Sequence, residues 1–257
     1  MNKVDQAVRS ENIRFENRNM AGAVFRNVNL HRSVFDGVNL GEARINNANL
    51  SGLTIDDANI IGLTIFGFRV DELIEAELDR RDPMRAQLRM ADPYDPECVR
   101  AVLERLDEMR AGFIAWLRAT GNSFLTQRPT PDQWSALELL RHLLFAEDLY
   151  TNRWLLQNDE PSNKLGLLPA FLADRSDFAD VGSQATDNLE AILSAWAAVH
   201  ARLTEFVANV TNNELRRDTS KKDFGQGTVG GVLQGLAQHD LEHVRQAEAV
   251  IRHLQAR

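Results

Sequence analysis

The stretch VNLHRSVFDGVNLGE, residues 28–42, has an apolar residue at every fifth position. A helix has a period of 3.6 residues and a half-buried strand a period of 2, so neither produces this spacing. It predicts a solenoid over residues 1–70, because stacked repeats bury their apolar side chains against one another. The apolar positions of the repeat are Phe15, Met20, Phe25, Leu30, Phe35, Leu40, Ile45, Leu50, Ile55, Ile60, Ile65 and Val70.

These pentads resemble the pentapeptide-repeat family, whose pattern A-(D/N)-L-x-x is visible in VNLHR, VNLGE, ANLSG and ANIIG, which begin at residues 28, 38, 48 and 58. The resemblance implies a short right-handed, four-sided β-helix in which the large residue of each pentad points inward. Phe15, Phe35 and Ile55 would then stack in one column. Because a short solenoid exposes its ends, we expect residues 71–95 to form a helical capping linker.

Composition limits the classes of function. The 257-residue chain has a formal net charge of −8, which disfavours binding to nucleic acid or to anionic membranes. A single cysteine, Cys98, excludes an internal disulfide framework. The sequence has no apolar run near the roughly 18 residues that a membrane span needs, and its first residues have no secretory pattern. We therefore expect a soluble, cytoplasmic protein.

After the turn-rich segment MADPYDPE, residues 90–97, the apolar residues recur with a helical period. Asp95 and Pro96 are typical of the N-cap and of the first position of a helix. Long amphipathic helices joined by modest loops form bundles. The predicted fold is therefore mixed, with a β-helix followed by a four-helix bundle over residues 96–257. The expected helices span residues 96–120, 130–157, 183–208 and 228–255.

Three histidines lie on the apolar faces of these helices. His239 and His243 are four residues apart, so they rise about 6 Å along one face and can bind the same metal ion. His142 lies on the apolar face of the second helix and can supply a third ligand. A lone buried histidine is more often a hydrogen-bonded core residue, but burying three imidazoles is costly unless a metal or hydrogen bonds compensate. The pattern favours a metal site.

The stretch HDLEH, residues 239–243, also matches the inverted zinc-protease motif H-x-x-E-H. Glu242 would then be the general base, but it lies roughly 80° from the direction that bisects the two histidines. His253, the one histidine that follows, is about 15 Å farther along the same helix. The protease interpretation is therefore disfavoured.

The stretches LELLRHLLFAEDLY, residues 137–150, and HDLEHVRQ, residues 239–246, resemble the DinB-like metal-dependent proteins. The resemblance covers residues 96–257 and implies that His142, His239 and His243 bind a divalent metal, zinc or nickel. Gln246 matches the Gln that often follows. Members often read H-R-x-Q at the end, whereas Val244 follows His243 here.

Members of this bacterial superfamily include thiol-dependent transferases and maleylpyruvate isomerases. The resemblance thus implies a transferase or isomerase that activates a low-molecular-weight thiol or water for a small-molecule substrate. Glu138, one turn before His142, is a candidate catalytic residue that carries protons, or else a solvated residue at the rim.

A non-catalytic scaffold or binding protein is the alternative. Its solenoid would contact another protein or a second copy of the chain in a homodimer. Residues 1–70 hold eight basic and seven acidic residues, so this solenoid lacks the negative charge of repeat proteins that resemble DNA.

Overall fold

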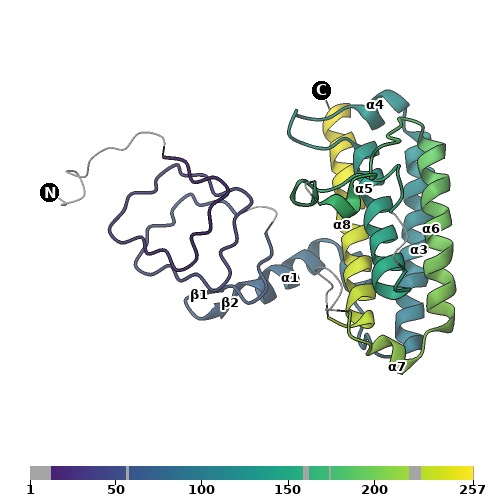
Figure 1. Ribbon diagram of the computed structural model, residues 1–257, viewed down its shortest axis with the longest axis horizontal. Coiled ribbons are helices and arrows are strands. Elements are labelled where there is room, and N and C mark those ends of the chain that lie inside the picture. The colour runs from purple at the N-terminus through teal and green to yellow at the C-terminus, as the bar shows by residue number, and fades with distance from the viewer. Residues whose placement is uncertain (1–12, 56–57, 159–161, 174, 220–226, 257) are drawn as a thin grey trace. The chain divides into compact units, whose positions relative to one another are not determined.

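The computed structural model describes residues 13–55, 58–158, 162–173, 175–219 and 227–256 (Figure 1). Its contacts divide the chain into two compact units, residues 1–54 and 55–257. The predicted domain limits at residues 70 and 95 stay predictions. Among the described helices, none is both long and apolar enough to cross a membrane.

Residues 13–54 form a regular series of turns. The backbone N–H groups of Ala23, Ser33, Ala43 and Leu53 each donate to the carbonyl three residues earlier, at 3.0 Å. The turns recur every ten residues, which is two pentads. In front of each turn an asparagine accepts a hydrogen bond from the backbone N–H two residues later, which explains why asparagine recurs in the pattern. These asparagines are Asn19, Asn29, Asn39 and Asn49.

The predicted β-helix is not formed as a ladder of strands. Among the described residues, the only strands are β1 (Thr64–Ile65) and β2 (Phe68–Arg69), which pair antiparallel. The large pentad residues, expected to be buried, remain accessible, with Phe15 63% and Phe35 55% exposed. The physical reason is that a ladder of strands needs backbone hydrogen bonds between coils, whereas those of the described residues 13–54 are local and close turns.

The segment after the repeat is helical. Helix α1 (Val70–Arg81) begins where the Val70 N–H donates to the Leu63 carbonyl, and α2 (Pro83–Gln87) follows. The side chains of Ile65 on β1 and Phe68 on β2 are 43% and 67% exposed, and the capping role of residues 71–95 stays a prediction. Farther along, Leu88 and Met90 are buried in the hydrophobic core of the bundle, so this linker is partly built into the helical unit.

The all-α bundle is confirmed. Figure 1 shows its four long helices side by side, and their contacts link α5 to α6 and α8, and α3 to the same two. The second and third helices start later than predicted. Ser135 and Glu138 form a capping box before α5, and Asn188 caps α6. The long helices are α3 (Pro96–Ala119), α5 (Ala136–Asp148), α6 (Leu189–Asn209) and α8 (Val229–Gln255).

Shorter elements complete this unit. A π-helical segment, η2 (Leu149–Leu155), continues α5 without a break. Helices α4 (Asn122–Thr126) and α7 (Asn212–Leu215) lie in the loops. The 3₁₀ turns η3 (Ala170–Leu172) and η4 (Ser176–Phe178) lie between η2 and α6. Helix α5 is buried over almost its whole length, including its polar residues His142, Glu147 and Asp148.

The start of α8 lies against the segment before α3. A Cβ atom at Gly230 would meet the Pro93 carbonyl oxygen at 2.1 Å. We therefore expect Gly230→Ala to lower the free energy of unfolding by about 1–3 kcal/mol, as overpacking typically does. Gly235 in the same helix is the control, because a Cβ atom there meets nothing within 4 Å.

Gly235→Ala should be neutral or stabilising by up to about 1 kcal/mol, from helix propensity alone. Urea denaturation of both variants measures the difference. Equal stability of the two would show that the approach of Pro93 does not constrain this helix.

Candidate metal centre

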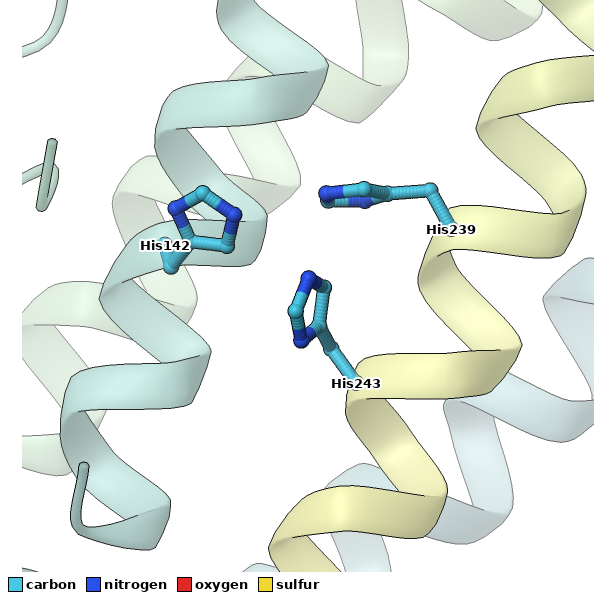
Figure 2. Close-up of side chains that lie close together, drawn as sticks. All are labelled: His142, His239 and His243. Carbon is cyan, nitrogen blue, oxygen red and sulfur yellow. The ribbon is translucent and has the colours of Figure 1, made fainter. Parts of the chain in front are cut away.

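The structure brings the three predicted histidines together. His142 projects from α5, and His239 and His243 project from α8 toward it (Figure 2). One ring nitrogen of each lies within 4.8 Å of one from each of the others. The ring centroids are 5.3 Å apart for His142 and His239, 4.8 Å for His142 and His243, and 4.4 Å for the pair on α8. The site thus offers three nitrogen donors from two facing helices.

Hydrogen bonds orient two of the rings. His142 Nδ1 lies 3.2 Å from the Leu167 carbonyl oxygen, and His243 Nδ1 lies 2.9 Å from Gln246 Oε1. Because a carbonyl oxygen only accepts, each Nδ1 donates its proton. The Nε2 atom of each ring then keeps its lone pair, which is the form that binds a metal.

Burial keeps these imidazoles neutral. Burial, together with the neighbouring His239 and His243, lowers the pKa of His142 from 6.5 to about 3. Burial and His239 also lower the pKa of His243. The Trp134 ring lies 5.0 Å from that of His142, and the Tyr150 ring 6.0 Å from that of His239. Burial also raises the pKa of Tyr150 to about 12, so its hydroxyl stays protonated at neutral pH.

The low pKa of His142 predicts a pH dependence of stability. Between pH 6.5 and about 3 the unfolded chain binds a proton at His142 that the folded chain does not. The metal-free protein should therefore lose stability as pH falls through this window, by up to about 1.4 kcal/mol per pH unit from this group. Above pH 6.5 His142 should contribute no pH dependence.

Urea denaturation in the presence of a chelator, with His142→Gln as the control, isolates this effect. The difference in unfolding free energy between the two proteins should be constant above pH 6.5. Below pH 6.5 the wild type should lose stability relative to His142→Gln. A difference that stays constant down to pH 4.5 would contradict the prediction.

Glu138 lies at the start of α5, where it caps the helix. Its carboxylate accepts hydrogen bonds from the Ser135 N–H at 2.9 Å and from the Arg128 guanidinium. Burial raises the pKa of Glu138, but these hydrogen bonds lower it more, to a value below the ordinary one. It lines a cavity of about 190 Å³ together with Arg128 and Arg141. Its catalytic role stays a prediction.

Other predicted features lie outside the cluster. Glu242 is exposed, which agrees with rejecting the protease interpretation. Gly235, one turn before His239 on α8, is also exposed. Gln246 bonds to His243, as described, while His253 is exposed. Cys98 packs against the core, with its thiol in the free state.

Sequence reasoning missed a buried polar cluster of Arg110, Glu147, Trp196, His200 and Asp240, which we call the Arg110 cluster. The Arg110 guanidinium bonds to Glu147, lies 4.1 Å from the centre of the Trp196 ring, and its Nε is 3.3 Å from Asp240 Oδ2. Trp196 and His200 also bond to Glu147, at 2.5 Å and 2.8 Å. All four long helices thus contribute to one network.

One sequence signal could have revealed this cluster. Arg110 continues the buried stripe of α3 that includes Val99, Leu103, Leu106 and Phe113. A charged residue at such a position must be paired, because an isolated buried charge is very costly. The partners themselves lie on other helices and leave no local pattern.

Comparison with known families agrees with this geometry. The DinB superfamily pattern matches residues 105–247, and pentapeptide repeats match residues 12–52 in eight copies. Neither the curated proteins nor the solved structures gave a match. The first match covers more than half of the chain and includes His142, His239 and His243. The chain therefore belongs to the DinB superfamily, in agreement with its helical unit and its histidine triad. It carries pentapeptide repeats before the DinB domain.

Proposed function

We propose that the protein binds one divalent metal ion, zinc or nickel, through His142, His239 and His243. The ion would activate a low-molecular-weight thiol or a water molecule for transfer to a small-molecule substrate or for its isomerisation. The observation that carries this proposal is the convergence of three histidine nitrogens within 4.8 Å. Membership of the DinB superfamily supports it.

The residues present fit such an ion. Imidazole nitrogens suit zinc and nickel, and a site with three protein ligands leaves a position for a substrate or water. His142 and His243 are neutral at pH 7 because their pKa values are lowered, so they need not lose a proton before binding. Their Nδ1 atoms are already engaged by Leu167 and Gln246, which fixes the ring orientation.

The ion, when bound, would lower the pKa of a thiol or water in an open position. The protein's own part is to hold the three rings and to surround them with apolar side chains. Trp134 and Phe145 lie against His142, with ring centroids 5.0 Å and 6.3 Å away. The Tyr150 ring packs near that of His239, with ring centroids 6.0 Å apart, and its hydroxyl is protonated at neutral pH.

Metal analysis of the purified protein, followed by activity assays, tests this function. We expect one zinc or nickel ion per chain, and metal-dependent consumption of an electrophile when low-molecular-weight thiols are supplied. Protein that is refolded with excess zinc and nickel and holds neither would overturn the proposal.

Glu138→Gln separates proton transfer from capping in the same assay. Glutamine can replace glutamate at the third position of a capping box, so the helix should remain intact. If Glu138 carries protons, turnover should fall while the metal content stays unchanged. Unchanged turnover would leave Glu138 with its capping role alone.

The repeat favours a second role in protein contact, the scaffold alternative. Val24 and Val34 are 76% and 86% exposed and lie ten residues apart in the repeat. If such side chains lie together on one face, they form the kind of contiguous apolar patch that marks a contact surface. We propose a second copy of the chain as the partner.

Sedimentation of the full chain should then show a dimer, and Val34→Asp should dissociate it. A wild type that is a monomer at all concentrations would refute the proposed dimer.

A further inference from the structure

We infer that Asp240 is a positioning residue, which orients His239 for metal binding and is itself held by Arg110. The inference rests on the proposed metal site. It concerns the one histidine of the triad whose orientation the described contacts leave unexplained.

His239 differs from its two neighbours in its hydrogen bonding. The Nδ1 atoms of His142 and His243 each have an acceptor, whereas His239 Nδ1 is buried without a hydrogen-bond partner among the described residues. A ring nitrogen left in this state costs free energy. Histidines that bind metals almost always donate their second ring N–H to a carboxylate, a carbonyl or water.

Asp240 is the complementary group. Its side chain is 1% exposed, and neither carboxylate oxygen has a hydrogen-bond partner in the described part of the chain. Oδ1 lies 3.8 Å from His239 Nδ1, which is longer than a hydrogen bond but close enough that a small side-chain rotation would form one. A buried donor and a buried acceptor, both unsatisfied, therefore face each other beside the triad.

The Arg110 cluster explains how this carboxylate is kept in place. Glu147 is well satisfied, since Arg110, Trp196 and His200 all bond to it. Among the described residues, Arg110 is the cationic partner of Asp240, with its Nε 3.3 Å from Oδ2. The guanidinium thus anchors one oxygen of Asp240 and leaves the other free to accept from His239.

The charge of Asp240 also acts on the site. It partly opposes the lowering of the pKa of His142 and of His243 that burial causes, and it adds to the raised pKa of Tyr150, so its field reaches these residues. A negative charge at this position favours a bound cation. Asp240 would therefore increase metal affinity in two ways, by orienting a ligand and by its charge.

Zinc affinity, measured by competition with a chelator, tests the inference in the full chain. Asp240→Asn should weaken zinc binding about 10- to 100-fold, as loss of an outer-shell partner typically does. Asp148→Asn is the matched control. Asp148 is a buried carboxylate on α5 that bonds to Asn152, to the Asn163 N–H and to Arg202, so its loss should leave zinc affinity unchanged.

Nitrogen NMR of the zinc-loaded wild type provides a readout that does not depend on any variant folding. His239 should carry its proton on Nδ1, as His142 and His243 should. A proton on Nε2 of His239, or an Asp240→Asn protein that binds zinc as tightly as the wild type, would overturn the inference and leave the proposed metal site standing. A wild type that binds neither zinc nor nickel would overturn both.

Discussion

Replacing Arg110 with methionine should lower the free energy of unfolding by about 3–5 kcal/mol, the range for breaking a buried ion pair from one side. The Arg110 side chain is only 6% exposed, and its removal leaves two buried carboxylates, Glu147 and Asp240, without their cationic partner. Because both carboxylates are buried, water cannot replace their contact with the guanidinium. Guanidinium chloride denaturation of the metal-free protein measures the change.

Arg118→Met is the matched control. Arg118 lies on the same helix and pairs with Glu190, but both side chains are more than half exposed. Exposed pairs contribute about 0–1 kcal/mol, so this variant should differ little from the wild type. If the two variants were equally stable, the Arg110 cluster would be no more than a set of weak surface-like contacts.

The second large effect concerns the metal. His142→Ala should weaken zinc binding by more than about 100-fold, beyond the range for an outer-shell partner, because it removes one of three direct ligands. It is also the one ligand that α5 supplies, so its loss leaves only the pair on α8. Any metal-dependent thiol chemistry should disappear with it. Chelator competition and metal analysis measure the loss.

His253→Ala is the control for this experiment. His253 is exposed near the end of α8 and takes no part in the histidine cluster. It should retain the zinc affinity of the wild type. Full zinc binding by His142→Ala would mean that the ion, if one binds, uses other residues.

The bundle could be predicted because its signals are local. Apolar residues at helical spacing placed all four long helices, and Asp95 accepts a hydrogen bond from the Glu97 N–H as an N-cap should. The start of α5 was predicted too early because Thr130 and Pro131 match the sequence pattern of an N-cap and a first helical residue. The helix begins after Ser135, which forms reciprocal hydrogen bonds with Glu138.

The proximity of the three histidines was predictable for the same reason, since helical spacing fixes the face on which each lies. The partners of Arg110 were not, because they come from α5, α6 and α8 and meet only in the folded bundle. In the repeat, the five-residue period was visible but its backbone hydrogen bonding was not. A period gives the spacing of turns without saying whether neighbouring coils pair as strands.

The neutral state of the buried imidazoles has a consequence for calorimetry. Many metal sites release protons as they fill, and the buffer then takes up those protons with its own heat of ionisation. At neutral pH His142 and His243 hold no extra proton to release. The contribution of these two ligands to the heat of zinc binding should therefore be the same in phosphate and in Tris buffer.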